Sequence, residues 1–156
     1  MVRYHNFDVV FAEIPDETTL AINITGCPNR CPGCHSPHLQ RDEGRPLDDA
    51  ELRALLGRYG ESVTCVCFMG GDASPHEIAR LARLVRQERT ALRTAWYSGR
   101  ADLPEGLDVA AFDYVKLGPW VERLGPLTAP TTNQRLYRRS DDGTLHDITE
   151  RFRRRT

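Results

Sequence analysis

Residues 62–89 read SVTCVCFMGGDASPHEIARLARLVRQER and predict a β-strand that leads directly into an α-helix. The strand is the apolar, β-prone run 62–69, which ends at a Gly-Gly-Asp turn. Ser74 and Glu77 then form a capping-box pattern, with a proline at the first helical position. The apolar side chains that follow recur at helical spacing and predict a stripe that faces the core: Ile78, Leu81, Leu84 and Val85.

The same alternation of strand and helix is found in other parts of the chain. Three more β-prone runs each stop at a glycine or at a cysteine-rich loop: TLAINIT (19–25), LRTAWYS (92–98) and FDYVKLG (112–118). Residues 47–60 predict a second helix, whose apolar face is formed by Leu52, Leu55, Leu56 and Tyr59. Strands that alternate with helices predict an α/β fold with a parallel sheet covered by helices.

The chain length limits how such a sheet can close. A closed eight-unit (β/α) barrel needs about 250 residues, and this chain has 156. We therefore expect one domain over residues 1–156, built as an open partial (β/α) barrel. A loop-rich segment after Gly118 leads to a predicted short C-terminal hairpin, with RLYRR (135–139) and TLHDIT (144–149) joined by the turn SDDG. In α/β folds the chemistry gathers where the parallel strands end.

The bulk composition is that of a soluble globular protein, with 40% hydrophobic and 28% charged residues. The formal net charge of -1 gives no electrostatic reason to expect nucleic acid as a partner. The N-terminal residues 1–17 are interrupted by polar and acidic side chains and do not resemble a signal peptide, and no uncharged apolar run is long enough to span a membrane. We expect a cytoplasmic protein, in which clustered cysteines serve as ligands more often than as disulfides.

Residues 27–38, CPNRCPGCHSPH, hold three of the five cysteines and two of the five histidines. A c-type haem attachment would use Cys31, Cys34 and His35, but covalent haem normally belongs outside the cytoplasm and Cys27 would have no role. A thioredoxin-like dithiol of Cys31 and Cys34 leaves the same cysteine over. Neither a haem attachment nor a dithiol therefore accounts for all three cysteines of the loop.

Zinc and iron–sulfur sites use the loop better. Zinc would be bound by Cys27, Cys31 and Cys34 together with His35 or His38, although structural zinc sites usually collect two separated pairs of ligands. Thiolates are the ligands that iron–sulfur clusters require, and clusters usually take four of them. Three cysteines on a four-iron cluster leave one iron open for a substrate, which favours a catalytic cluster.

The spacing Cys-x3-Cys-x2-Cys in a loop after the first predicted barrel strand resembles the radical S-adenosylmethionine (SAM) enzymes. Four motifs resemble one group within them, the anaerobic ribonucleoside-triphosphate reductase activating proteins: GCPNRCPGCHS, MGGDAS, AWYSG and NQRLY. The resemblance spans nearly the whole chain. Gly33, before the third cysteine, agrees with this group, whereas Leu117 stands where the group often has an aspartate.

The resemblance implies a partial barrel of the radical SAM type and two cofactors, a 4Fe-4S cluster and SAM. It assigns the cluster and the catalytic centre to Cys27, Cys31 and Cys34. It assigns contacts with SAM to Gly33 and His35 beside the nucleoside, and to Gly70, Gly71 and Asp72 at the methionine amino group. Ser98 and Gly99 end a strand on the same rim, where they could contact the ribose or the sulfonium. Lys116 is the only lysine of the chain and could pair with the SAM carboxylate.

The activity that the resemblance implies is that of an oxidoreductase acting on another protein. Reductive cleavage of SAM gives methionine and a 5'-deoxyadenosyl radical, which takes a glycine Cα hydrogen from the anaerobic ribonucleoside-triphosphate reductase. A low-potential electron donor such as flavodoxin or ferredoxin is also implied. The alternatives are activation of another glycyl-radical enzyme of the formate-lyase type, other radical SAM chemistry, and a non-catalytic, zinc-stabilised binding module.

Four further side chains have packing as their first interpretation. Cys65 and Cys67 lie two apart on a predicted strand, so they share a face with Val63 and Met69 and read as small buried hydrophobes. Trp96 and Tyr97 read as packed strand residues first and as an adenine platform second. The loop 126–134 either closes over the cofactor or caps the barrel.

Overall fold

The structure is a computed structural model that describes residues 2–26 and 44–153. Its strands are β1 (Arg3–Val10), β2 (Thr19–Ile24), β3 (Arg45–Pro46), β4 (Cys65–Met69), β5 (Arg93–Tyr97), β6 (Tyr114–Leu117), β7 (Arg135–Arg139) and β8 (Leu145–Asp147). Its α-helices are α1 (Asp49–Tyr59) and α2 (Pro75–Glu88), and short 3-10 turns cover Val109–Ala111, Glu122–Leu124 and Thr149–Arg153.

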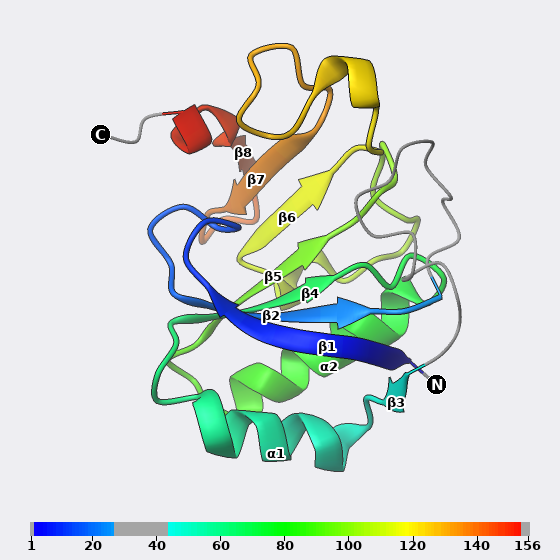
Figure 1. The fold of residues 1–156 in the computed structure, drawn as a ribbon. Coiled ribbons are helices and arrows are strands. Elements are labelled where there is room, and N and C mark those ends of the chain that lie inside the picture. Colours follow the sequence, from blue (N-terminus) through cyan, green and yellow to red (C-terminus); the bar gives the residue numbers. More distant parts are fainter. Residues whose placement is uncertain (1, 27–43, 154–156) are drawn as a thin grey trace.

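All the described strands belong to one eight-stranded sheet in the order β3-β1-β2-β4-β5-β6-β7-β8 (Figure 1). The four central strands β2, β4, β5 and β6 are parallel to one another. The outer strands pair antiparallel on both sides, β1 and β3 on one edge and β7 and β8 on the other. The fold is therefore mixed α/β, with a parallel centre as the sequence predicts.

The four predicted strands and both predicted helices are confirmed, with ends that differ by at most three residues. The predicted C-terminal hairpin is confirmed as β7 and β8. Its turn is closed by the Ser140 amide, which donates to the Thr144 carbonyl at 2.9 Å, and by the Asp142 carboxylate, which accepts from the Thr144 amide at 2.9 Å.

Strand β1 is the largest element that the sequence pattern did not predict. Only Tyr4 of its eight residues is fully buried, because the strand carries His5, Asn6 and Asp8 among its apolar side chains. Its order comes from antiparallel pairing with β2 over most of its length, with an irregularity between Tyr4 and Asn6. Strand β1 is thus stabilised by pairing with a buried neighbour, and its own sequence lacks the apolar pattern that would predict a strand.

The two helices begin in different ways. At α1 the Asp48 side chain accepts from the Glu51 amide at 2.8 Å, which is a normal N-cap. At α2 the predicted capping box is wrong, because the side chain of the N-cap residue, Ser74, makes no capping hydrogen bond. Glu77 pairs instead with Arg80, and Arg80 reaches Asp49 of α1 at 2.8 Å. Glu77 therefore belongs to a set of ion pairs that connects α1 and α2, and it does not cap α2.

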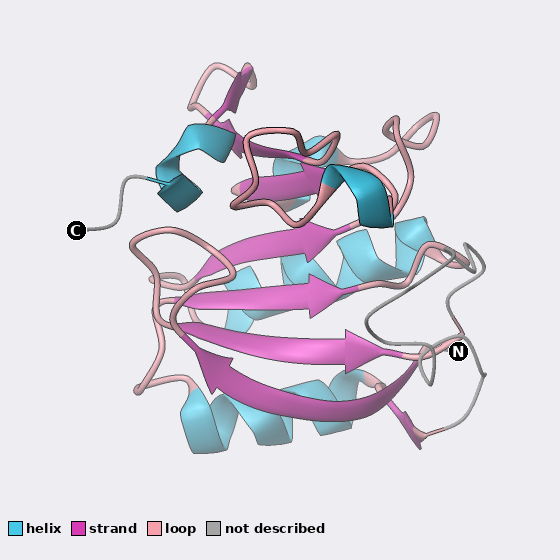
Figure 2. Ribbon diagram, turned by 45° about the horizontal axis from the view of Figure 1, so that its top comes forward, coloured by secondary structure: helices cyan, strands magenta, loops and turns pink. Residues whose placement is uncertain are grey.

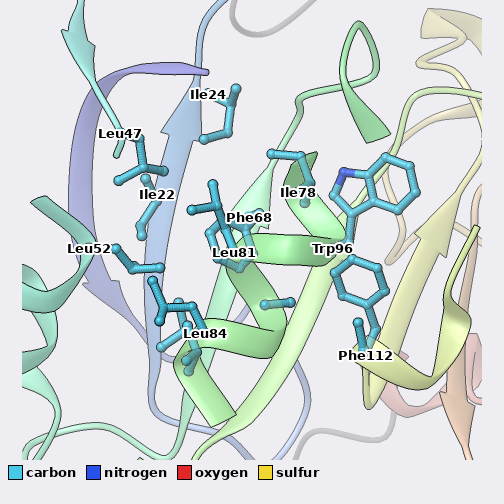
Figure 3. Packing of buried hydrophobic residues seen from close by; sticks show 14 of the residues in the cluster. Ile22, Ile24, Leu47, Leu52, Phe68, Ile78, Leu81, Leu84, Trp96 and Phe112 are labelled. Carbon is cyan, nitrogen blue, oxygen red and sulfur yellow. The ribbon is translucent and has the colours of Figure 1, made fainter. Parts of the chain in front are cut away.

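Both helices pack against the same face of the sheet (Figures 1 and 2). The apolar cluster between them contains alternate residues of the central strands and the predicted stripes of α1 and α2 (Figure 3); among its members are Ile22, Phe68, Trp96, Leu52, Ile78 and Leu81. Trp96 stacks on Phe112 with a centroid separation of 5.7 Å. Because it is fully buried there, the packing interpretation of Trp96 is confirmed.

The opposite face of the parallel strands carries a second, smaller apolar cluster that includes Ile14, Cys65, Cys67, Ala95, Tyr114, Leu136 and Phe152. Cys65 and Cys67 are fully buried in it, so their interpretation as small hydrophobes is confirmed. Val63 does not share their face as predicted, because it lies before β4 begins and packs in the helix-side cluster. No helix in the described part of the chain is both long enough and apolar enough to cross a bilayer.

Candidate functional site

Five of the residues that the sequence assigns to the site fall outside the described residues: Cys27, Cys31, Cys34, Gly33 and His35. Strand β2 ends at Ile24, shortly before this segment begins. Within residues 2–26 and 44–153, no group of three or more histidine, cysteine or acidic side chains could hold a metal ion. The predicted cluster ligands are the three cysteines that follow β2 in the sequence.

The other six residues assigned by the sequence all lie at the carboxyl ends of the parallel strands: Gly70, Gly71, Asp72, Ser98, Gly99 and Lys116. The register places the last residues of the four strands side by side: Asn23 pairs with Met69, Met69 with Tyr97, and Tyr97 with Lys116. We call the edge formed by residues 70–72, 98–100 and 116–118 the rim. The chain enters the cysteine segment from the β2 end of this same edge.

Asp72 and Ser98 are joined at the centre of the rim. The Ser98 hydroxyl donates to Asp72 Oδ1 at 2.6 Å, and the Gly99 amide donates to Asp72 Oδ2 at 2.8 Å. Asp72 is 2% exposed and Ser98 is fully buried. These bonds hold the turn after β5 against the turn after β4, so the carboxylate acts first as a bridge between two strand ends.

Lys116 extends this bridge to β6. Its ammonium donates to the carbonyls of Ser98 at 2.9 Å and Gly118 at 3.0 Å, and lies 5.6 Å from the centre of the Tyr97 ring. The side chain is 7% exposed. A buried ammonium is stabilised by such carbonyl and aromatic contacts, and it thereby fixes the ends of two neighbouring strands.

Gly70 and Gly71 turn the chain from β4 into α2 with φ angles of +104° and +90°. A Cβ on Gly71 would lie 2.6 Å from Ile78 of α2, and one on Gly70 would lie 3.3 Å from the carbonyl oxygen of Ile24. The Gly70 carbonyl also accepts from the Trp96 indole at 2.7 Å. The glycines are required because the turn combines a positive φ with close packing on both sides.

Arg100 of the rim and Asn133 beside it are two further residues that the sequence did not assign to the site. Arg100 follows Ser98-Gly99; its amide donates to the Ser98 hydroxyl at 3.1 Å and its guanidinium to the Asp72 carbonyl at 3.2 Å. Asn133 donates to the Pro119 carbonyl at 3.1 Å, while its Oδ1 is buried with no hydrogen-bond partner among the described residues. Arg100 could have been found from its position next to AWYSG, whereas Asn133 lies in the loop whose role the sequence left open.

The amino ends of the strands carry a separate polar network around Glu17, which is 8% exposed. Its carboxylate accepts from Thr64 at 2.7 Å, from Tyr114 at 2.8 Å and from Arg93 at 3.1 Å. Burial, followed by the hydrogen bond to Glu17, raises the pKa of Tyr114 above its usual value. This network ties β4, β5 and β6 together at the edge remote from the rim, so we assign it to the scaffold.

The face of the sheet that carries Cys65 and Cys67 has no reactive thiolate near neutral pH. Burial raises the pKa of both thiols, and the Cys67 thiol lies 3.4 Å from the Met69 sulfur. Tyr97 is held on the same face by a hydrogen bond from its hydroxyl to the Glu13 carbonyl. The chemistry of this protein is therefore expected at the rim and in the cysteine segment.

Comparison with known proteins bears on that segment directly. Neither a curated protein nor a solved structure matches the chain. The family model for a 4Fe-4S single cluster domain matches residues 18–101, which is more than half of the chain and runs from the start of β2, through the cysteine segment, to the rim residues after β5. An iron–sulfur protein is thereby supported, and the chain belongs to the 4Fe-4S single cluster domain family.

Proposed function

We propose that this protein is a radical SAM activating enzyme that generates the glycyl radical of an anaerobic ribonucleoside-triphosphate reductase. The observation that supports the proposal is a three-cysteine motif that follows β2 in the sequence, within the match to the 4Fe-4S domain, together with a polar rim at the carboxyl ends of the parallel strands β4, β5 and β6. The four parallel strands would form the centre of an open partial (β/α) barrel of the radical SAM type, as one domain.

The residues present fit the two cofactors. Three thiolates, Cys27, Cys31 and Cys34, are a suitable donor set for a 4Fe-4S cluster that keeps one iron open. The amino-acid end of SAM carries an ammonium and a carboxylate, which need acceptors and donors respectively. Near the rim, Asn133 Oδ1 is a buried acceptor without a described partner, and Arg100 is an exposed donor.

A 4Fe-4S cluster held by Cys27, Cys31 and Cys34 would supply the one electron needed to cleave SAM reductively to methionine and a 5'-deoxyadenosyl radical, which would take a hydrogen atom from a glycine Cα. The chain itself positions the reacting atoms and keeps water away from them. Asp72, Ser98 and Lys116 hold three strand ends in register through hydrogen bonds of 2.6–3.0 Å. Gly70 and Gly71 allow the turn after β4 to lie close to Ile24 at the end of β2.

Two partners belong to the proposal. One is the glycyl-radical subunit of the reductase, whose loop would have to reach the cluster through the open side of the sheet. The other is a low-potential electron donor such as flavodoxin or ferredoxin.

The first test is anaerobic reconstitution with iron and sulfide. We expect a brown protein with four irons and four sulfides per chain; dithionite and SAM should then yield 5'-deoxyadenosine and methionine. Cys31→Ala should abolish both the cluster and the cleavage. Cys67→Ala is the matched control, because this thiol is buried in the sheet and should leave the iron content unchanged.

The identity of the substrate needs a second measurement. Incubation with the anaerobic reductase, SAM and dithionite should give the doublet of a glycyl radical in electron paramagnetic resonance spectra. A doublet obtained only with a formate-lyase type partner would reassign the substrate. A colourless protein with stoichiometric zinc would support a zinc-stabilised binding module and end the enzymatic proposal.

A further inference from the structure

Arg100 is fixed at the rim by contacts with three strand ends. Its amide binds the Ser98 hydroxyl after β5, and its guanidinium binds the Asp72 carbonyl after β4 at 3.2 Å. Its carbonyl accepts from the Gly118 amide after β6 at 2.7 Å. The side chain nevertheless remains exposed. The backbone of Arg100 and one nitrogen of its guanidinium are thus held by the rim, and the other guanidinium donors make no ion pair with an acid of the described residues.

The pairing of Arg100 differs from that of most other arginines. Arg53 pairs with Glu88 and Arg86 with Asp113, as do most arginines of the helices with a neighbouring acid. Among residues 2–26 and 44–153, no ion pair includes Arg100. The carboxylate of Asp72, whose backbone carbonyl accepts from Arg100, is already bound by Ser98 and Gly99 through its two oxygens.

Guanidinium groups recognise carboxylates through two parallel N–H bonds. Because the Arg100 guanidinium donates only one hydrogen bond within the described residues, to the Asp72 carbonyl, it still has a pair of N–H donors for such a carboxylate. Lys116 differs, because its ammonium is buried and donates to two carbonyls of the rim. One of these belongs to Gly118, whose amide holds the Arg100 carbonyl. The two cations can therefore have separate tasks, in which Lys116 positions the turn and Arg100 meets the ligand.

We propose that Arg100 binds the carboxylate of the amino-acid end of SAM. This inference rests on the proposed function, because SAM is the ligand concerned. It also gives a reason for the Asp72–Ser98 bridge. Asp72 is the one acid of the rim, and because its carboxylate oxygens already accept hydrogen bonds from Ser98 and Gly99, it does not compete with SAM for the guanidinium. Arg100 would then determine specificity for ligands that carry a carboxylate.

The test measures SAM binding rather than turnover. The reconstituted wild-type protein and its Arg100→Met and Arg100→Lys variants are titrated with SAM without a reductant, so that SAM is not cleaved, and binding is followed by equilibrium dialysis and by the change in the spectrum of the oxidised cluster. Arg100→Met should weaken binding about tenfold to a hundredfold, the range for losing a charged hydrogen bond. Arg100→Lys should recover part of that loss. Arg58→Met, at an exposed arginine near the end of α1, is the matched control and should bind SAM like the wild type.

A ligand without the carboxylate separates recognition from a structural effect. Decarboxylated SAM should bind the wild type and Arg100→Met with equal affinity. An equal loss for both ligands would mean that the substitution disturbs the turn, and would overturn the proposal, as would wild-type affinity of Arg100→Met for SAM. Failure of the wild-type protein to bind SAM at all would instead contradict the proposed function.

Discussion

Asp72 has both carboxylate oxygens committed to the turn after β5, one to the Ser98 hydroxyl and one to the Gly99 amide. It is also almost completely buried. A charged acceptor in this position contributes through hydrogen bonds that water cannot replace, so its removal leaves two buried donors with weaker partners.

Asp72→Asn tests this role with little change in shape. The amide keeps one acceptor but directs an NH2 group at a donor, so we expect the free energy of unfolding to fall by about 1–3 kcal/mol. Ser98→Ala removes only one donor and should cost less, about 1 kcal/mol. Urea unfolding followed by circular dichroism measures both.

Asp102→Asn is the control for the residue scale, because Asp102 is an exposed aspartate in the loop that follows the rim. Its substitution should change stability by less than about 0.5 kcal/mol. If Asp72→Asn were as stable as Asp102→Asn, the Asp72–Ser98 bridge would not be a structural contact in solution.

The residues of this site could be predicted to different degrees. Asp72 and Ser98 were found because each follows an apolar strand, but their direct bond could not be foreseen, since it depends on how two turns meet across the sheet. Arg100 was not singled out because exposed arginines are common in this chain. The roles of Cys27, Cys31 and Cys34 are implied by the resemblance to radical SAM enzymes and stay predictions, because these residues lie outside the described part of the chain.

At the scale of elements, the turn between β4 and α2 has the strictest requirements. It must reverse direction after Met69, take a positive φ at two consecutive glycines, and bring the first turn of α2 against the sheet. Ile78 of that turn is fully buried and occupies the space next to the Gly71 α-carbon. The backbone conformation and the packing therefore both exclude a side chain at position 71.

Gly71→Ala should destabilise the protein for these two reasons. A left-handed backbone costs a non-glycine residue about 1–3 kcal/mol, and the forced contact with Ile78 adds an overpacking cost of about 1–3 kcal/mol. Gly57→Ala is the matched control, because Gly57 lies on the exposed face of α1 and a Cβ there meets nothing within 4 Å. That substitution should stabilise the protein by about 0.5–1 kcal/mol.

Thermal unfolding of the two alanine variants gives opposite signs if this reasoning holds. A Gly71→Ala protein with unchanged stability would show that the turn can relax away from α2. Because both substitutions add the same methyl group, the comparison isolates the effect of the surroundings.

The elements also show where sequence patterns fail. Apolar runs identified β2, β4, β5 and β6, because these strands are buried on both faces and need no alternation. They did not identify β1, which is ordered by pairing with β2 while most of its side chains stay partly exposed. The capping box of α2 failed because Glu77 has a better partner in Arg80, which in turn binds α1.

At the scale of the whole molecule, the sheet separates two interiors. One face packs against the helices mainly through apolar side chains, with Tyr4 among them, while the other buries several ionisable groups among apolar side chains: Cys65, Cys67, Tyr97 and Tyr114. The Glu17 network closes this second face at the amino ends of the strands, and the Lys116 and Asp72 contacts close it at the rim. The interior that faces away from the helices is thus apolar in its middle and polar at both edges.

This distribution predicts that the protein loses stability in alkaline solution. Burial raises the pKa of Cys65, Cys67 and Tyr97, so the folded protein keeps these protons after the unfolded chain has lost them. The unfolded chain then binds fewer protons than the folded one, and the stabilisation, fully present below about pH 9, declines as the pH rises further. Each such group lowers the free energy of unfolding by about 1.4 kcal/mol per pH unit once its unfolded form is ionised.

Urea unfolding between pH 7.5 and 10.5, compared for the wild type and Cys67→Ala, measures the contribution of one group. The variant is less stable at pH 7.5 because it loses buried packing. As the pH rises, however, its free energy of unfolding should fall less steeply than that of the wild type, by the slope that corresponds to about one proton. The other cysteines are common to both proteins, so their titration cancels in the difference. Parallel pH profiles would show that the Cys67 thiol ionises as readily in the folded protein as in the unfolded chain, which a fully buried position in β4 does not allow.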